Sequence, residues 1–409
     1  MRSVEHIQRD IETIAGFTET PGQGATRPTF SPAWAAARDY VIRELEACGC
    51  RVQIDPAGNL RARSAAVAFE TPAWLSGSHL DTVPHGGNFD GVVGVVAALE
   101  ALRAAREAGK VLPMELVVWA EEEGTTFGLG MLGSRAVAGT IDADQLASIK
   151  NGAGQSYLDA GAAHGVVPAR IADARLQPGR AVGLIEVHVE QGPGLWNNDQ
   201  PVAVVGAIAG RKQYRLTVKG VANHAGSTRM SDRFDALAGA GEVIVAMERL
   251  ARELAHDSVI TVGQISCKPN AMNVIAEEAT LTIDFRSPSM DVLGRGDVLI
   301  RKQIDAISDH RRLTYELDDV EFHPALAMDE RVCARLHKAA AKCGFGEIPT
   351  TTSGALHDAA ILAPLVPTAM LFVASRDGIS HNPGEFSRYE DIATAATILG
   401  EAVRNRSLD

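Results

Sequence analysis

Residues 116–123 read LVVWAEEE, so that five apolar residues run directly into three carboxylates. A strand that is apolar throughout is typical of a parallel sheet with helices on both faces. Open α/β sheets hold their ligands at the carboxyl ends of such strands, which is where Glu121, Glu122 and Glu123 follow. The stretch predicts an α/β fold with a functional edge, although a solvated acidic turn is the ordinary explanation of adjacent carboxylates.

The outer parts of the chain alternate between strand-like and helical patterns. This alternation is typical of an α/β layer in which helices flank a sheet on both sides. The expected helices lie at 34–48, 92–108, 330–342 and 389–405, and the expected strands lie at 73–78, 114–120 and 368–374.

The middle of the chain has a different order. Strand patterns at 214–220, 259–267, 279–286 and about 313–320 enclose helical patterns at 234–254 and 292–309. This β-α-β-β-α-β order is the ferredoxin-like arrangement. Because 409 residues exceed the usual size of one hydrophobic core, two domains are expected. We place an inserted domain at 210–321 and a discontinuous larger domain at 1–209 and 322–409.

Composition narrows the function classes. The net charge of −12 argues against a nucleic-acid partner, and no apolar run approaches the 18 residues of a membrane span. Charged residues in MRSVEHIQRDIETIAGF stand where a signal peptide would be apolar, so a cytoplasmic location is expected. The odd count of five cysteines disfavours a disulfide framework. Cys48 and Cys50 are either a metal or redox pair or small, partly buried side chains at a helix end.

His79 and Asp90 flank a glycine-rich turn. His79 ends an apolar strand pattern, and the Asp81 carboxylate could accept its second ring N–H and fix the tautomer. Taken alone, His79 is a satisfied core histidine and Asp90 is a helix N-cap. Taken together, they favour metal ligation, because imidazoles and carboxylates suit zinc, manganese or cobalt.

The acidic triplet and two further histidines extend this pattern. A general base beside a metal-ligating carboxylate would need the adjacency of Glu122 and Glu123. His188 lies in an alternating strand pattern, LIEVHVE, and His381 lies in a loop of Gly, Ser, Asn and Pro residues after an apolar strand. If these side chains converge, the protein is a hydrolase with two metal ions.

The inserted segment contributes further candidates. His224, in Ala-Asn-His-Ala-Gly-Ser, is either an ordinary turn histidine or an oxyanion donor for a neighbouring active site. Arg286 ends the strand pattern LTIDFR, where it could form a surface ion pair or hold a substrate carboxylate. Asn273 precedes another apolar run.

From about Gly77 onward the chain resembles the di-metal amidohydrolases related to aminoacylases and carboxypeptidases. More narrowly, it resembles the hydantoinase/carbamoylase branch, which contains N-carbamoyl-L-amino-acid hydrolases, allantoate amidohydrolases and β-ureidopropionases. The motifs that carry the resemblance, in order, are GSHLDTV, GGNFDG, EEEG, GSR (133–135), EVHVEQGP, NHAG, DFR, SGALHDA (353–359) and SRDGISHNP.

The resemblance implies an exopeptidase-like catalytic domain with a mixed sheet flanked by helices, two divalent ions (zinc, manganese, cobalt or nickel) and an inserted ferredoxin-like lid. His79 and His188 would hold one ion, Glu123 and His381 the other, and Asp90 would bridge them. Glu122 would be the general base. The lid would form a homodimer in which His224 and Asn273 serve the partner's active site. The implied substrate-binding residues are Gln191, Gln213, His224, Asn273, Arg286, Ser353, Gly354 and Ala355.

Three positions depart from the branch's usual pattern. Gln213 stands where arginine or tryptophan is common, Leu356 replaces a smaller residue, and His85 replaces an asparagine. They leave the expected metal centre intact but bear on substrate choice.

The resemblance implies hydrolysis of a linear C–N bond in an N-carbamoyl or ureido acid that carries a carboxylate, such as allantoate. The alternatives are an N-acyl amino-acid deacylase or aminopeptidase with the same metals, and a non-catalytic binding protein of the same fold. The non-catalytic binding protein is disfavoured because every expected ligand position and the base are present.

Overall fold

The computed structural model describes residues 2–255 and 257–408, which divide into two compact units. Unit 1 comprises the described residues up to Gly206, then Met328–Thr351 and the residues from His357 onward. Unit 2 comprises Ala207–Ala327 and Thr352–Leu356. The inserted domain expected at 210–321 lies within unit 2. The short stretch at 352–356 joins unit 2 because the Ala209 N–H donates to the Ser353 carbonyl, at 2.7 Å.

The larger sheet has the order β1-β2-β4-β3-β5-β16-β6-β14, and β15 pairs with β6. Its centre, β4-β3-β5-β16, is parallel, whereas β1, β2, β6 and β14 are antiparallel to their neighbours. The strands are β1 (Cys50–Ile54), β2 (Leu60–Ser64), β3 (Ala73–His79), β4 (Met114–Trp119), β5 (Ala181–Val189), β6 (Val202–Ile208), β14 (Leu326–Ala327), β15 (Thr350–Ser353) and β16 (Thr368–Val373).

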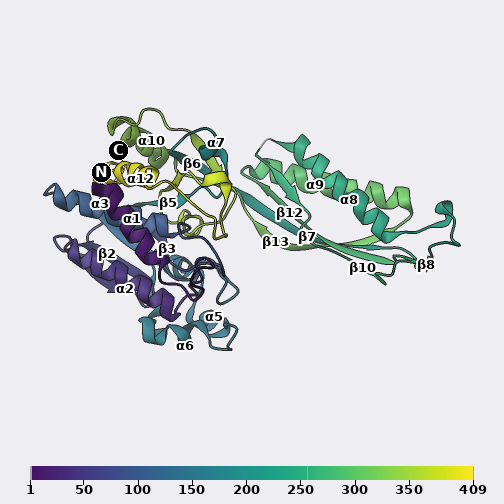
Figure 1. The fold of residues 1–409 in the computed structure, drawn as a ribbon, viewed down its shortest axis with the longest axis horizontal. Helices are drawn as coiled ribbons and strands as arrows, with labels where there is room; N and C mark the ends of the chain where they lie inside the picture. Colours follow the sequence, from purple (N-terminus) through teal and green to yellow (C-terminus); the bar gives the residue numbers. More distant parts are fainter. Residues whose placement is uncertain (1, 256, 409) are drawn as a thin grey trace. The chain divides into compact units, whose positions relative to one another are not determined.

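Helices cover both faces of this sheet (Figure 1). On one face α1, α3, α10 and α12 form a continuous layer in which α1 contacts α12, while α4 and α11 contact the sheet on the other face. The helices of unit 1 are α1 (Arg2–Ala15), α2 (Pro32–Ala47), α3 (Val92–Glu107), α4 (Leu132–Ala138), α5 (Ala143–Ser148), α6 (Tyr157–Gly161), α7 (Gly194–Asn197), α10 (Glu330–Lys342), α11 (Asp358–Leu362) and α12 (Tyr389–Ala402), with 3-10 turns at Ala162–His164, Pro168–Ala174 and Arg376–Gly378.

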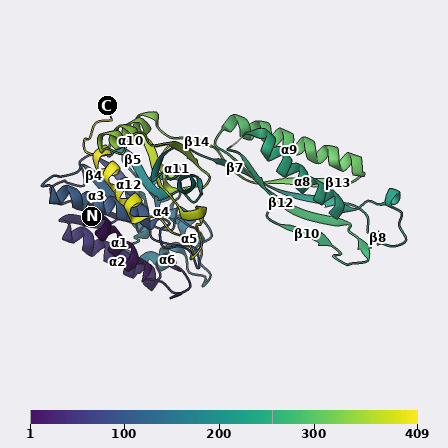
Figure 2. The ribbon, with the colours of Figure 1, turned by 45° about the horizontal axis from the view of Figure 1, so that its top comes forward.

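Unit 2 is an antiparallel sheet with two helices on one face (Figure 2). The sheet order is β10-β12-β7-β13, and β9 also pairs with β12. Alternate residues of β12 face the helices and are buried, among them Leu281, Ile283 and Phe285. The elements are β7 (Gly210–Lys219), β8 (Asn223–His224), α8 (Ala236–Leu254), β9 (Val259–Thr261), β10 (Ile265–Lys268), β11 (Val274–Ile275), β12 (Glu278–Ser287), α9 (Met290–Arg311) and β13 (Thr314–His323), with a 3-10 turn at Met230–Asp232.

The predicted α/β class, the mixed sheet and the β-α-β-β-α-β order are confirmed, and most elements lie within a few residues of their expected ends. One local prediction differs. The single strand expected at 259–267 is split into β9 and β10, since residues 262–264 belong to no strand. The strand expected around His188 is β5, which is buried throughout from Gly183 because it is a central parallel strand.

Cys48 and Cys50 acquire no chemical role in the structure. Cys48 and Cys50 are free thiols, and burial raises the pKa of both, which disfavours the reactive thiolate. Within the described residues no helix is long and apolar enough to cross a membrane.

Candidate metal centre

The parallel strands of unit 1 end at one edge of the sheet and bring distant residues together there. His79 is the last residue of β3, the acidic triplet follows β4 by one residue, and His188 lies near the end of β5. His381 comes from the loop after β16. Parallel strands point their carboxyl ends the same way, so residues far apart in sequence meet. The side chains that converge are His79, Asp90, Glu122, Glu123, His188 and His381.

Asp90 is the centre of this group. Its Oδ1 lies 3.1 Å from Nε2 of His188 and 3.6 Å from Nε2 of His79. Its Oδ2 lies 3.1 Å from Nε2 of His381, which is in turn 3.5 Å from Oε2 of Glu123. The two oxygens of one carboxylate therefore face two separate sets of ligand atoms.

Asp90 is not a helix N-cap, which was the alternative explanation of this residue. Helix α3 is capped by Gly91, which makes no side-chain cap. Gly91 has a φ of 66°, and a Cβ there would lie 2.5 Å from the ring of His79. The turn thus needs glycine so that the His79 ring can lie against the start of the helix.

The three glutamates after β4 have different environments. Glu122 Oε2 lies 3.7 Å from Nε2 of His79, and Glu123 shares a ligand group with Asp90 and His381. Glu121 is fully buried, and its carboxylate accepts the N–H groups of Thr126 and Phe127. The triplet is therefore not the solvated turn that adjacent carboxylates usually form.

Main-chain carbonyls orient two of the histidines. Nδ1 of His79 lies 2.9 Å from the carbonyl oxygen of Asp81, and Nδ1 of His188 lies 3.0 Å from that of Val189. A donated Nδ1–H leaves Nε2 free as the ligand atom. The prediction that the Asp81 carboxylate accepts the His79 N–H is thereby corrected, because the carboxylate is 3.9 Å from Nδ1 and instead accepts the Glu123 N–H.

The electrostatics of this group favour bound cations. Burial raises the pKa of Glu122 well above its usual value, and burial together with Asp90 raises the pKa of Glu123 to about 7. Hydrogen bonding to Asp90 raises the pKa of His381 to about 9. Without a cation the group therefore holds extra protons to offset its crowded carboxylates.

The donor set fits a pair of divalent cations. Imidazole nitrogens and carboxylate oxygens are the ligands of zinc and similar ions. Two ligands on one tetrahedral ion with bonds of about 2.0 Å lie about 3.3 Å apart. The distances from Asp90 to His188, His79 and His381, between 3.1 and 3.6 Å, bracket that value.

Residues that the sequence analysis missed hold Asp90 in place. The Glu385 carboxylate accepts the N–H groups of Phe89 (2.8 Å) and Asp90 (3.0 Å). Ser380 Oγ lies 2.8 Å from Glu385 and 3.1 Å from Oδ2 of Asp90. A Cβ at Gly87 would overlap the Glu385 carboxylate. Glu385 therefore ties the loop of Asp90 to the loop of His381; its five-residue separation from Ser380 was the only signal in the sequence.

A second buried layer lies behind His188. The centroids of the His357 and His188 rings lie 4.4 Å apart in an edge-to-face arrangement. His357 also forms a group of possible metal ligands with Glu186 and His188. Glu186 accepts the Ser78 hydroxyl and the Ala359 N–H. Burial lowers the pKa of His357 well below its usual value, so this ring is neutral.

The remaining predicted residue of unit 1 contacts the centre directly. Gln191 donates from Nε2 to Oδ2 of Asp90 at 2.9 Å, and its own N–H donates to Ser375.

His224 and Asn273 meet within unit 2. The Ala225 N–H donates to the Asn273 carbonyl, where β8 pairs with β11. Nδ1 of the exposed His224 accepts the N–H groups of Gly226 and Ser227, at 3.0 and 3.2 Å. An accepting Nδ1 places the proton on Nε2, which makes the ring a donor. These bonds hold the ring within its own turn.

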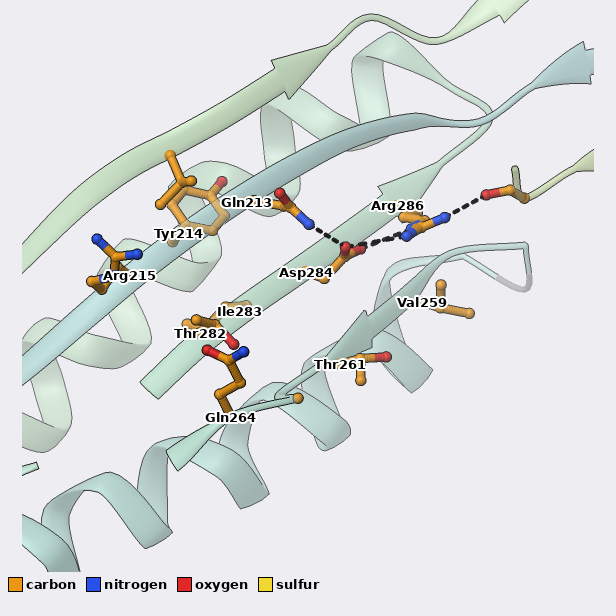
Figure 3. A pocket seen from close by; sticks show the side chains of 13 residues that line it. Gln213, Tyr214, Arg215, Val259, Thr261, Gln264, Thr282, Ile283, Asp284 and Arg286 are labelled. Carbon is orange, nitrogen blue, oxygen red and sulfur yellow. Dashed lines mark hydrogen bonds and ion pairs between the residues drawn. The ribbon is translucent and has the colours of Figure 1, made fainter. Parts of the chain in front are cut away.

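The other candidates of unit 2 form a second group. Arg286 donates to the Gly354 carbonyl, while Gln213 and Arg286 both contact Asp284. In the turn that contains Gly354, the Ala355 N–H donates to the Ser353 hydroxyl. The surface ion pair that was the alternative for Arg286 therefore exists, and it lies inside a pocket (Figure 3).

The chain is similar to several known proteins. The model of peptidase family M20/M25/M40 matches residues 75–405. The N-carbamoyl-L-amino acid amidohydrolase of Geobacillus stearothermophilus is 35% identical, covering 98% of this chain and 97% of the relative. The allantoate amidohydrolase of Escherichia coli K12 is 32% identical, covering 96% and 95%. The crystal structure of a hydantoinase/carbamoylase family amidase from Burkholderia multivorans superimposes with a TM-score of 0.90 at 32% identity, covering 99% and 98%.

Metal binding is expected to release protons. Ligands must be deprotonated to bind, and the metal-free pKa values of Glu123 (about 7) and His381 (about 9) are raised. Because protons compete with the ions, metal affinity should increase as pH rises from 6 to 8. Calorimetric titration at pH 7 in two buffers of different ionisation enthalpy should reveal release of about one proton or more per chain. An affinity independent of pH would contradict this account.

Glu385→Ala is expected to weaken metal binding by about tenfold or more, because it frees the loop that carries Asp90. The matched control is Asp329→Ala, which also removes a carboxylate that accepts two main-chain N–H groups, those of Arg331 and Val332 at the start of α10. Calorimetry should give wild-type metal affinity for the control. Equal affinities in both variants would contradict the role of Glu385.

Proposed function

Because this chain belongs to peptidase family M20/M25/M40, and within it to the hydantoinase/carbamoylase amidases, we propose that it hydrolyses an N-carbamoyl amino acid or a related ureido acid. Its enzyme class follows from its relatives: it is a hydrolase of non-peptide C–N bonds in linear amides. The observation that carries the proposal is the Asp90 carboxylate, whose two oxygens face two ligand sets at the carboxyl edge of the sheet.

The family depends on a dinuclear metal centre, and this chain has the ligand clusters for one. We assign His79 and His188 to one ion, Glu123 and His381 to the other, and Asp90 to both. Two bound cations would polarise the substrate carbonyl and make water more acidic. The native metal is proposed to be zinc, manganese, cobalt or nickel, all of which accept these ligands.

Glu122 is proposed as the general base. Its burial raises its pKa well above the usual value, so its carboxylate has a high affinity for a proton. It would take a proton from the attacking water and deliver it to the leaving nitrogen, which closes the proton balance of the hydrolysis. Glu123, its neighbour in sequence, would stay a ligand.

Substrate recognition is assigned to polar groups of both units. Gln191, which contacts Asp90, would bind the substrate near the metals, and Arg286 would hold its carboxylate beside the turn at 353–355. The Nε2–H of His224 would stabilise the oxyanion. Unit 2 is proposed as the lid and dimerisation domain of a homodimer in which His224 and Asn273 serve the partner subunit. A cytoplasmic location stays a prediction.

Glu122→Gln is expected to keep both metal ions and to lose activity by about a thousandfold or more, because a carboxamide cannot accept the proton. Metal content should be measured by elemental analysis and turnover on the metal-loaded protein. Near wild-type hydrolysis by this variant would remove Glu122 from its role.

A substrate panel tests the reaction itself. The metal-reconstituted enzyme should release ammonia from N-carbamoyl amino acids, allantoate or ureidopropionate, since cleavage of a ureido group liberates carbamate, which decomposes to ammonia and carbon dioxide. N-acyl amino acids and dipeptides should be hydrolysed at least about a hundredfold more slowly, which corresponds to about 2.7 kcal/mol of transition-state binding. Release of a free amino acid from those substrates without ammonia would favour a deacylase or an aminopeptidase.

A further inference from the structure

A pocket of about 660 Å³ lies on the face of the unit 2 sheet that α8 and α9 leave open. The side chains of β12 alternate, so Thr282, Asp284 and Arg286 face this pocket while their neighbours face the helices. Figure 3 shows Gln213, Asp284 and Arg286 joined by a chain of hydrogen bonds. Of these three, only Arg286 has a role in the function proposed above. The family resemblance makes Gln213 a substrate-binding residue and gives Asp284 no role.

Arg286 is held at three of its N–H groups. Nε donates to Oδ1 of Asp284 at 2.8 Å, Nη2 donates to Oδ2 at 3.2 Å, and Nη1 donates to the Gly354 carbonyl at 2.8 Å. A guanidinium carries five N–H groups. One N–H is therefore left on each terminal nitrogen, and both are available to a substrate carboxylate.

Asp284 is also held from the neighbouring strand. The pairing of β12 with β7 places Asp284 directly opposite Gln213, and Nε2 of Gln213 donates to Oδ2 of Asp284 at 2.8 Å. Hydrogen bonds from Arg286 and Gln213 outweigh burial and lower the pKa of Asp284, which keeps it ionised. Gln213 thus reaches Arg286 only through Asp284.

We propose that Asp284 is a positioning residue that sets the direction of Arg286, and that Gln213 fixes Asp284 in turn. The inference rests on the proposed function, because it gives Arg286 a substrate carboxylate to hold. An arginine side chain free to rotate would lose entropy on binding that carboxylate, whereas the Asp284 pair removes this cost beforehand. Gln213, which departs from the usual pattern of the family, then acts on recognition from behind Arg286.

The test compares Asp284→Asn with Glu278→Gln. Glu278 lies on the same strand and the same face, pairs with Lys268 at 2.7 Å, and does not line the pocket. Both substitutions turn a carboxylate into a carboxamide. Each variant is assayed on an N-carbamoyl amino acid and on its primary amide, which lacks the carboxylate. Separately, the metal-free protein without substrate is treated with phenylglyoxal, and modification of Arg286 is followed by peptide mapping with the exposed Arg252 as reference.

Asp284→Asn should raise KM for the acid about tenfold and leave kcat within about threefold, because Arg286 loses its charge-assisted hydrogen bonds to Asp284. A tenfold change corresponds to about 1.4 kcal/mol. The primary amide should be affected less than about twofold, and Glu278→Gln should match wild type on both substrates. Arg286 should be modified at least about threefold faster in Asp284→Asn, because fewer of its N–H groups are held.

Gln213→Ala covers the case in which Asp284→Asn fails to fold, since it leaves the charges intact. It should raise KM for the acid and the modification rate of Arg286 about twofold to threefold. If phenylglyoxal modifies Arg286 in the folded variants at the wild-type rate, the inference is wrong, whatever the kinetics of hydrolysis. Failure of the wild-type enzyme to hydrolyse any ureido acid overturns the proposed function, and the modification rates still decide the inference.

Discussion

The packing of like-charged carboxylates at one sheet edge is the constraint on which the rest of unit 1 depends. Parallel strands β4, β3 and β5 end together, so Glu122, Glu123 and Asp90 lie largely buried within a few ångströms of the same histidines. Buried carboxylates are costly unless they gain protons or cations. The raised pKa values of Glu122 and Glu123 correspond to the gain of protons. Bound metal ions would offset the same repulsion instead. A fold that accepts this cost at its edge is one adapted to hold cations there.

The same need explains the surroundings of Asp90. A carboxylate shared between two ligand sets must be fixed at both oxygens, or one set is lost. Gln191 and Ser380 donate to Oδ2 of Asp90, and the Glu385 carboxylate accepts the main-chain N–H of Asp90. Gly87 and Gly91 are small because Glu385 and a histidine ring occupy the space that a side chain would need. The glycine-rich turn at 86–91 is therefore a consequence of the site.

Much of this arrangement could be predicted, because the spacing of apolar residues and the positions of the turns mark it in the sequence. The apolar run before Glu122 and the turn before Asp90 are local signals, and the ordered motifs supplied the rest. Glu385 was missed because Phe89 and Asp90, whose N–H groups it accepts, lie about 295 residues away, and its short separation from Ser380 is a weak signal. For His79, the expected acceptor was the Asp81 carboxylate rather than its carbonyl, since spacing places a residue but not its rotamer. Asp284 lies two residues from Arg286 on one strand face, a signal that was available and unused.

The proposed metal centre and the proposed carboxylate clamp belong to different units, which affects how substrate specificity can change. The proposed ligands and base belong to unit 1, while the proposed carboxylate clamp, Arg286 with Asp284, belongs to unit 2. Two of the three departures from the family pattern, Gln213 and Leu356, also belong to unit 2. Substitutions there alter the pocket without touching the buried carboxylates, so they avoid the electrostatic cost that restricts unit 1. Substrate preference can therefore drift by changes behind Arg286 while the metal centre stays the same.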